Sequence, residues 1–498
     1  MSYVLGIDQG SSGSRALLLD REGRPCGYGY APVYSLTSRP DYVEQRPEDV
    51  LGSVLHAVHR AMEESSVKPR QIVACGIACQ RNTEFVWDAV SGLTLANAIS
   101  WQDMRTLPLL EEAARLPFFH QAAQVLGYPP GPYSAALHLA WRMRHQPEVA
   151  AAAQAGRLRV GLSAEYIVHA LGRLYEHAMD ASLVQALGLF DFRQFTYWDE
   201  WVNWVGVPQE ALPAPKPTIH QFGELHLESA TIPVVAMIGD QQAALFGHGA
   251  HHRGQAKCTH GTASFVNVFT GEEVQMVQGI HTYFAWSVNG SWTYCLEADT
   301  TVTGAAIRWL HTKASLLADE REIDVLASSV PDSGGVVFVP AFTGLNVPYH
   351  DRRAQAAVLG LSFSSTRAHV ARALLESIGF QVRAILDTIT SNTDIIVPCL
   401  AVDGGIARSD IACQVLADLT GLEVVRPDFT ELTAWAAALL AGIAAGLWTF
   451  DQLPPTPGGQ TVFRPAMSRA AREAAYARWN AAVQAVRLFG SQAGFSNT

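Results

Sequence analysis

The stretch LGIDQGSSGSRALLLD, residues 5–20, places a loop of glycine and serine between two apolar runs. This pattern predicts a strand over 3–8, a tight turn over 9–14 and a second strand over 15–20. Backbone N–H groups of residues 10–13 could line a concavity that holds phosphate. The lysine of the P-loop pattern G-x-x-x-x-G-K-[ST] is missing, however. On these residues alone, a phosphate site and an ordinary hairpin turn both remain open.

Two charged residues of this stretch bear on that choice. Asp8 ends the first apolar run, and a carboxylate buried there is costly unless it is paired or faces an ion. A Mg²⁺ ion held through water molecules would satisfy it. Arg15 would add positive charge beside the loop.

The composition sets the class of protein. The chain has 498 residues, of which 49% are hydrophobic and 16% charged, so we expect a well-buried globular protein of several domain-sized units. The net charge of −11 argues against a nucleic-acid partner. Seven scattered cysteines and an amino terminus without a secretory pattern favour the cytoplasm. The apolar segment 432–448 is too short for a membrane span and is expected to be a helix packed in the core.

The order of predicted elements indicates two α/β halves. A helix over 47–64 and a buried strand over 72–79 follow the opening hairpin. A second strand–turn–strand pattern recurs at 254–271, and 397–421 reads as a strand, a glycine turn and a helix. This internal duplication predicts two domains around a cleft, with a boundary that gives domains 1–250 and 251–498.

Two later strand ends carry candidate site residues. Asp240 follows an apolar strand, where open α/β sheets place their ligands, and could act as a general base. A helix N-cap is the alternative role for Asp240. Gly404 and Gly405 would let the backbone approach a nucleotide closely, or simply form a tight turn.

Histidine and cysteine clusters offer weaker candidates. His248, His251 and His252 match no standard zinc spacing, which favours a solvated loop. Cys75 and Cys79 fit no redox motif, which favours inert core thiols.

Taken in order, several motifs resemble the FGGY carbohydrate kinases, most closely the glycerol kinase group. The motifs are IDQGSSGSR, QRNTEFVWD, ISWQDMRT, GDQQAALFG, THGTASF, the segment 344–381, which tracks a signature of the family, and VDGG. The likeness runs over roughly 3–490. It implies two ribonuclease-H-like domains of the actin, hexokinase and Hsp70 superfamily, with an interdomain cleft that takes ATP, Mg²⁺ and a small polyol or sugar.

The resemblance also implies roles for matching positions. Asp240 would be the base that takes the proton from the attacking hydroxyl, and Asp8 would hold Mg²⁺ through water. The positions implied for ATP binding are Ser11, Ser12, Gly13, Arg15, Thr262, Gly304, Arg308, Gly405 and Ser409. Those implied for acceptor binding are Arg81, Asn82, Trp101, Tyr133, Asp240, Gln241 and Phe265.

Two departures from the glycerol kinase pattern concern specificity. Glycerol kinases carry Gln-Arg-Glu where this chain has Gln80-Arg81-Asn82, and Asn82 is neutral and one methylene shorter. If this region is a strand, Glu84 shares the face of Asn82 and could stand in for the glutamate or fit a longer substrate. The segment 224–233 lacks the glycine-rich loop that bacterial glycerol kinases use for fructose 1,6-bisphosphate, so we expect no inhibition by that compound.

These observations favour an ATP-dependent kinase for glycerol or a related small polyol. The alternative acceptor is a four- or five-carbon polyol or ketose such as erythritol, threitol, xylulose or ribulose. An alternative of another class is an actin- or Hsp70-like ATPase switch, which needs no acceptor pocket of aromatic residues and arginine. A homodimer or a homotetramer is compatible with the sequence.

Overall fold

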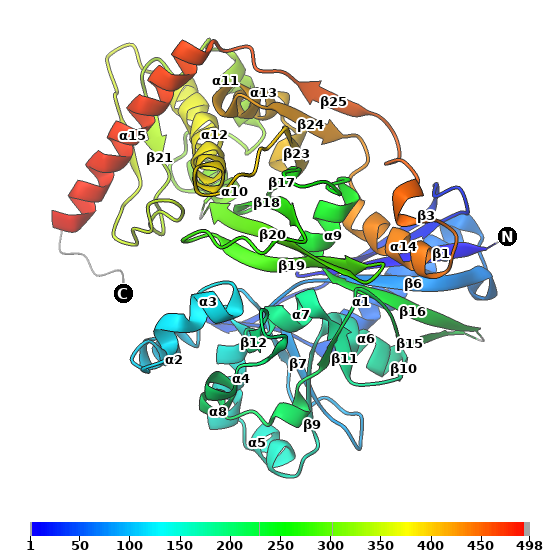
Figure 1. The fold of residues 1–498 in the computed structure, drawn as a ribbon. Helices are drawn as coiled ribbons and strands as arrows, with labels where there is room; N and C mark the ends of the chain where they lie inside the picture. The colour runs from blue at the N-terminus through cyan, green and yellow to red at the C-terminus, as the bar shows by residue number, and fades with distance from the viewer. Residues whose placement is uncertain (1, 229, 301, 493–498) are drawn as a thin grey trace. The chain divides into compact units, whose positions relative to one another are not determined.

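The computed structural model describes residues 2–228, 230–300 and 302–492, and the chain forms two compact units (Figure 1). Unit 1 comprises residues 1–249, 282–294 and 431–457, and unit 2 comprises 250–281, 295–430 and 458–498. Two segments from the second half of the chain therefore belong to unit 1. None of the described helices combines the length and the hydropathy that a bilayer crossing requires.

Unit 1 contains these strands: β1 Tyr3–Gly10, β2 Gly13–Leu19, β3 Pro25–Pro32, β4 Leu36–Arg39, β5 Tyr42–Gln45, β6 Ile72–Cys79, β7 Glu84–Asp88, β8 Ala98–Ile99, β9 Leu158–Leu162, β10 Gly172–Leu174, β11 Ala178–Asp180, β12 Phe190–Asp191, β13 Thr196–Tyr197, β14 Ala214–Lys216, β15 Ile219–Leu227 and β16 Ala230–Gly239. Its helices are α1 Pro47–Ser65, α2 Leu107–Ala113, α3 Ala122–Leu126, α4 Ala135–His145, α5 Pro147–Gln154, α6 Ser163–Leu171, α7 Ala181–Ala186, α8 Asp199–Val205, α9 Asp240–Gly247 and α14 Leu432–Ala444, with 3-10 turns at Pro69–Gln71, Phe119–Gln121, Gln209–Ala211 and Phe450–Gln452.

Unit 2 contains β17 Ala256–His260, β18 Ser264–Gly271, β21 Val337–Val339, β22 Ala357–Leu359, β23 Cys399–Gly404, β24 Glu423–Pro427 and β25 Gln460–Phe463. Its helices are α10 Gly304–Thr312, α11 Glu322–Ser328, α12 Arg367–Asn392, α13 Asp410–Thr420 and α15 Arg469–Gln492, with a 3-10 turn at Ile406–Arg408. The chain passes from one unit to the other within β19 (His281–Val288) and β20 (Ser291–Thr300).

The main sheet of unit 1 brings three parallel strands to one edge. Its strand order is β10-β15-β16-β6-β1-β2-β3, with β6 parallel to both β1 and β16. In this register Cys79 pairs with Gln9 on one side and with Gly239 on the other. The three strands therefore end together, which is where open α/β sheets present functional side chains.

The opening stretch forms the predicted hairpin, with longer strands and a shorter turn than expected. Gly10 pairs with Gly13 and Asp8 pairs with Arg15 across β1 and β2. The tip of the turn consists of Ser11 and Ser12. The predicted helix and buried strand that follow are also present, as α1 and β6.

Helix α14 packs against the middle of this sheet through glycines. It lies within the predicted apolar segment 432–448 and is almost entirely buried. A Cβ added to Gly6 of β1 would lie 2.0 Å from the backbone oxygen of Ala434, and one added to Gly76 of β6 would lie 2.0 Å from that of Ala437. The expected alanine-rich core helix is confirmed, and the close approach explains why the facing strands carry glycine.

A second sheet of unit 1 supports the residues that follow β6. Its strand order is β4-β5-β8-β7-β9, and Glu84 of β7 pairs with Ile99 of β8 and with Leu162 of β9. The chain between Cys79 and Glu84 is a loop that connects the two sheets.

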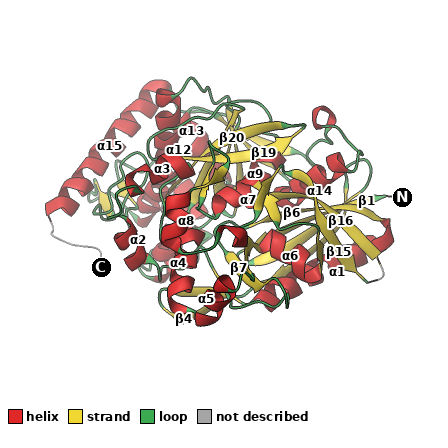
Figure 2. Cartoon of the chain, turned by 60° about the horizontal axis from the view of Figure 1, so that its bottom comes forward, coloured by secondary structure: helices red, strands yellow, loops and turns green. Residues whose placement is uncertain are grey.

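Unit 2 repeats the pattern of a hairpin beside parallel strands. Five consecutive strands of its sheet run in the order β18-β17-β23-β24-β25, and β17 is parallel to β23. His260 pairs with Gly404, so the turn after β17 and the turn after β23 leave the same edge. Figure 2 colours the helices, strands and loops of both units by type.

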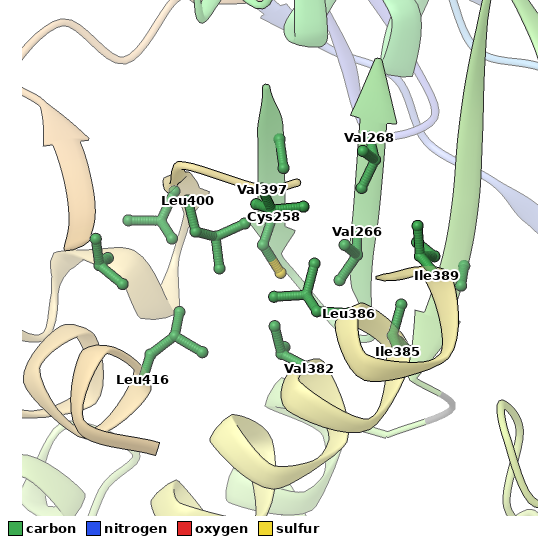
Figure 3. Packing of buried hydrophobic residues seen from close by; sticks show 14 of the residues in the cluster. Cys258, Val266, Val268, Val382, Ile385, Leu386, Ile389, Val397, Leu400 and Leu416 are labelled. Carbon is green, nitrogen blue, oxygen red and sulfur yellow. The ribbon is translucent and has the colours of Figure 1, made fainter. Parts of the chain in front are cut away.

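Helix α12 covers this sheet with an apolar stripe. Its contribution to the core comes from Val382, Ile385, Leu386 and Ile389, which recur at helical spacing and point toward β17 and β18 (Figure 3). The residues that these side chains meet are buried and aliphatic or thiol, among them Cys258, Val266, Val268, Leu400 and Leu416.

The glycine contacts of α14 generate a stability prediction. We expect Gly76→Ala to lower the free energy of unfolding by about 1–3 kcal/mol, the usual cost of overpacking, because its Cβ would clash with backbone that cannot move aside. Gly52→Ala is the matched control: the position lies within α1, where an added Cβ meets nothing within 4 Å. This control should raise stability by about 0.5–1 kcal/mol. Urea unfolding of the two variants gives the comparison, and equal midpoints would contradict the packing.

Candidate active site

Hydrogen bonds from a neighbouring side chain and from the backbone fix the turn between β1 and β2. The Ser11 carbonyl accepts a hydrogen bond from Gln45 Nε2 at 2.8 Å, and the Ser12 carbonyl accepts one from Val33 N at 3.0 Å. Gly13 is required by packing, because an added Cβ would lie 2.6 Å from the Tyr30 ring. The turn is therefore a rigid feature whose outermost residue, Ser12, is exposed.

Asp8 and Arg15 lie side by side below this turn. Arg15 Nη1 is 3.4 Å from Asp8 Oδ2, and Arg15 Nε is 3.1 Å from Glu431 Oε2. The guanidinium also lies 5.4 Å from the centre of the Tyr30 ring. Arg15 is thus shared between two carboxylates.

The environment of Asp8 suits a cation. Burial raises the pKa of Asp8 to about 7; Arg15 opposes the rise, while the charges of Asp240 and Glu431 add to it. Carboxylate oxygens are the ligands that Mg²⁺ prefers, and Mg²⁺ usually keeps several of its waters. Across the described residues, no group of three or more His, Cys, Asp or Glu side chains could hold a metal ion. Asp8 fits an ion bound through water, which needs only acceptor oxygens nearby.

Asp240 lies at the same edge of the sheet, at the first position of α9. Gly239, the last residue of β16, is the N-cap, and the Gln241 N–H donates to Asp240 Oδ1 at 2.8 Å. The start of a helix favours a negative charge. Arg81 Nε lies 3.8 Å from Asp240 Oδ1, and the Arg81 guanidinium stacks 4.6 Å from the centre of the Tyr283 ring. The alternative role of Asp240 as the helix N-cap is therefore wrong, because Gly239 takes that position and no side chain caps the helix.

The loop after β6 carries Arg81 and Asn82. Asn82 has a left-handed backbone, with φ of 59°, which asparagine tolerates better than most residues. Its Oδ1 is buried and accepts no hydrogen bond from the described part of the chain. This amide oxygen is the kind of group that a hydroxyl donor on a ligand would satisfy.

Glu84 does not take the place of the missing family glutamate. The idea required 80–84 to be one strand, but β6 ends at Cys79 and β7 begins at Glu84. Glu84 is fully buried and accepts from Arg142 Nε at 2.7 Å, with His138 Nδ1 at 2.9 Å. Arg142 Nη2 also donates to the Asn97 carbonyl at 2.6 Å. The carboxylate therefore stabilises α4 against β7 and β8.

Trp101 and Tyr133 lie on loops that hydrogen bonds hold to neighbouring parts of unit 1. The Trp101 N–H donates to Thr83 Oγ1 at 3.2 Å, and Thr106 Oγ1 donates to the Pro132 carbonyl at 2.6 Å. Trp101 is 37% exposed, which is unusual for tryptophan and leaves its ring available to a ligand. Tyr133 packs over Gly131, where an added Cβ would lie 2.2 Å from its ring.

In unit 2, the five residues expected to bind nucleotide line one pocket of about 530 Å³. These residues are Thr262, Gly304, Arg308, Gly405 and Ser409. Such a volume suits a nucleotide-sized ligand. The sequence interpretation did not identify the apolar wall of the pocket, which consists of Ile307, Ile323, Leu375 and Ile406.

The residues that line this pocket differ in the contacts that they make with the rest of the protein. A Cβ added to Gly405 meets nothing within 4 Å, so no protein contact requires glycine there and the space is open. Gly304 starts α10, and its N–H donates to the Gly261 carbonyl at 3.1 Å. Ser409 Oγ donates to Asp324 Oδ1 at 2.7 Å and caps α13. Arg308 Nε lies 3.3 Å from Glu320 Oε1.

Phe265 is the expected acceptor residue that belongs to unit 2. It lies in β18, pairs with Thr259 of β17, and is half-buried. The other acceptor positions, from Arg81 to Gln241, all belong to unit 1.

Of the two thiols expected to be inert, Cys79 is buried with its pKa raised by burial to about 12, and burial also raises the pKa of Cys75.

Comparisons with known proteins agree on the family and the fold. Residues 3–247 match the model of the FGGY family of carbohydrate kinases, N-terminal domain, and residues 256–445 match that of its C-terminal domain. The chain is 35% identical over 483 residues to glycerol kinase 2 of Sulfolobus acidocaldarius, covering 97% of each chain. It is 36% identical over 489 residues to the glycerol kinase of Symbiobacterium thermophilum, covering 97% of this chain and 98% of the relative.

Among solved structures, Plasmodium falciparum glycerol kinase with ADP superposes with a TM-score of 0.90 at 26% identity and covers 98% of each chain. Ligand-bound xylulose kinase from Lactobacillus acidophilus superposes with a TM-score of 0.86 at 18% identity over 99% of each chain, which shows the fold alone. The expected fold class, two ribonuclease-H-like α/β domains, is confirmed.

The buried Glu84 cluster generates a prediction. Glu84→Gln leaves the Arg142 guanidinium buried without a countercharge, so we expect a loss of about 3–5 kcal/mol in the free energy of unfolding. Glu112→Gln is the matched control, because it removes an exposed pair at 2.9 Å from Arg144, on the same helix α4. That change should cost less than about 1 kcal/mol. Chemical denaturation of both variants measures the difference, and similar small losses would show that the cluster does not support α4.

Proposed function

The chain belongs to the FGGY family of carbohydrate kinases, and on this premise we propose that it phosphorylates a primary hydroxyl of glycerol or of a closely related small polyol with ATP. The observation that carries the proposal is the placement of Asp240 at the strand edge, 3.8 Å from Arg81 and within electrostatic reach of Asp8. The glycerol kinases among the similar proteins support glycerol as the acceptor.

In the proposed reaction, Asp240 accepts the proton of the primary hydroxyl as the hydroxyl oxygen attacks the γ-phosphorus of ATP. The bond between that phosphorus and the β–γ bridging oxygen breaks, and ADP leaves. Arg81 lies beside the Asp240 carboxylate and holds a hydroxyl of the acceptor, while the buried Asn82 Oδ1 accepts a hydrogen bond from another. Such a reaction depends mainly on positioning and on neutralising charge.

The other charges at this edge suit the phosphates. When bound through water to Asp8, Mg²⁺ would supply charge neutralisation on the phosphate oxygens. Ser11, Ser12 and Gly13 would present backbone donors to the phosphates. Arg15 is held between Asp8 and Glu431 and adds positive charge below the turn.

The pocket of unit 2 would bind the base and ribose of a nucleotide. Its apolar wall suits a purine ring, and the open space at Gly405 leaves room for adenosine. Thr262 and Gly304 line this pocket where the turn after β17 meets the start of α10.

One observation favours a second acceptor class. Asn82 is shorter than the glutamate that the family carries at this position. The loop 80–83 contains no carboxylate that could replace this glutamate, and the next one, Glu84, is paired with Arg142. The space left by the missing methylene and the loss of one charge would suit a four- or five-carbon polyol or ketose. An ATPase switch without an acceptor is disfavoured, because it gives no role to the exposed Trp101 ring or the unpaired Asn82 oxygen.

An acceptor screen tests the proposed function. ADP release from ATP and Mg²⁺ is measured with glycerol, dihydroxyacetone, erythritol, threitol, xylulose and ribulose. We expect glycerol to give the highest kcat/KM, because the two relatives described above are glycerol kinases. Activity with a four- or five-carbon acceptor and none with glycerol would establish the second class. ADP release that no acceptor increases would contradict both.

The role of Asp240 gives a further prediction. We expect Asp240→Asn to lower kcat about 10²–10⁴-fold, the usual contribution of a general base, while ATP affinity measured by calorimetry is retained. Asp199→Asn is the matched control, because Asp199 is also the first residue of a helix, α8, in the same unit. This control should keep wild-type turnover. Normal turnover in Asp240→Asn would rule out the proposed base.

A further inference from the structure

A chain of buried glutamine side chains connects the turn between β1 and β2 at residues 11–12, called here the phosphate turn, to the loop 80–83 after β6, called the acceptor loop. Gln45 Nε2 donates to the Ser11 carbonyl at 2.8 Å, and Gln80 Nε2 donates to Gln45 Oε1 at 2.9 Å. Gln80 Nε2 also donates to Gln9 Oε1 at 3.1 Å, and Gln9 Nε2 donates to the Gly10 carbonyl at 2.7 Å. These three glutamines, at most 2% exposed, have no access to water that could replace the bonds.

The chain continues to the far side of the acceptor loop. Thr83 Oγ1 donates to Gln80 Oε1 at 3.0 Å and accepts from the Trp101 N–H at 3.2 Å. The Gln80 N–H donates to the Gln9 carbonyl at 2.9 Å. Gln80 therefore binds the phosphate hairpin with its amide group and backbone, and it directly precedes Arg81.

The direction of every bond in this chain is fixed. Starting at the Trp101 N–H, each group donates toward the phosphate turn, and the last acceptors are backbone carbonyls of Gly10 and Ser11. A backbone carbonyl can only accept, so the amide orientation of Gln9 and Gln45 follows, and Gln80 must then present its NH₂ group to both. A buried network with all bonds made is rigid, whereas one broken bond leaves polar groups unsatisfied.

We propose that Gln45 and Gln80 are positioning residues that hold the phosphate turn and the acceptor loop in one geometry, so that the γ-phosphoryl group passes to the acceptor rather than to water. This inference rests on the proposed function. The two glutamines touch neither substrate: they act through Ser11 on the phosphate side and through Arg81, Asn82 and Trp101 on the acceptor side.

The products of the reaction show whether the acceptor hydroxyl is aligned with the γ-phosphorus. In the coupled reaction the acceptor hydroxyl attacks the γ-phosphorus, and the products are ADP and a phosphomonoester. When the acceptor oxygen is displaced, water can attack the same phosphorus, giving ADP, inorganic phosphate and a proton. A displacement of about 1 Å can cost on the order of 10²-fold in transfer rate. The ratio of inorganic phosphate to phosphorylated acceptor therefore reports alignment, independently of how much enzyme is folded.

The test substitutes Gln45→Met, which keeps the length of the side chain and removes both of its bonds. With ATP, Mg²⁺ and the best acceptor of the screen, we expect transfer to fall about 10- to 100-fold and the ratio of inorganic phosphate to phosphorylated acceptor to rise by a similar factor. Gln381→Met is the matched control. Gln381 is buried in helix α12 of unit 2, and its Nε2 donates to the Ser377 carbonyl at 3.2 Å, outside the chain of glutamines. This control should lower the thermal midpoint and leave the ratio unchanged.

A second pair of variants covers the case in which Gln45→Met does not fold. Thr83→Val removes the hydroxyl that joins Gln80 to Trp101, and Thr83→Ser keeps it. We expect the valine variant to raise the ratio and the serine variant to return it to the wild-type value. A wild-type ratio in the folded Gln45→Met or Thr83→Val enzyme overturns the inference alone. A wild-type chain that transfers phosphate to no acceptor overturns the proposed function, and the inference with it.

Discussion

The candidate site depends on the parallel pairing of β1, β6 and β16, which end at one level where Gln9, Cys79 and Gly239 are in register. This register fixes where the next side chains emerge. Asp8 lies one residue before the edge, Gln80 one residue after it, and Asp240 begins the helix that follows. Backbone ladders hold the strand residues next to these groups, so the sheet positions them more accurately than flexible loops would.

The carboxylates near this edge carry negative charge that two arginines partly neutralise. Burial raises the pKa of Asp8 to about 7, and the charges of Asp240 and Glu431 add to the rise. Arg15 lies within 3.4 Å of Asp8 and 3.1 Å of Glu431, and Arg81 lies 3.8 Å from Asp240. Arg15 and Arg81 therefore neutralise part of this negative charge. An added cation next to Asp8 would neutralise the rest.

Much of the fold could be predicted from local patterns, because strands and helices with one buried face repeat their apolar residues at a fixed period. The hairpin at 3–19, helix α1 and the buried helix α14 all follow from such patterns. The family resemblance then located the pocket of unit 2, whose five expected residues lie together. Its apolar wall was missed, because Ile307, Ile323 and Leu375 come from three separate helices and each reads as an ordinary core residue.

The wrong interpretation of Glu84 has a clear physical cause. Alternation predicts one face only while a strand continues, and the chain leaves the sheet at Gln80. Glu84 then meets His138 and Arg142, which lie more than fifty residues away in sequence. The glutamine chain was missed for a similar reason. Gln9 lies in β1, Gln45 is the last residue of β5 and Gln80 follows β6, so only the folded structure shows that the three amides form one network.

The central claim is that this edge directs phosphate to a carbon-bound hydroxyl. Phosphorus-31 NMR of the chain with ATP, Mg²⁺ and glycerol tests it most directly, because the method identifies each phosphorus species as it forms. The account predicts loss of the γ-phosphate signal, growth of one phosphomonoester signal and equal growth of ADP. Appearance of inorganic phosphate in place of the phosphomonoester, with glycerol and with every other acceptor of the screen, would contradict it.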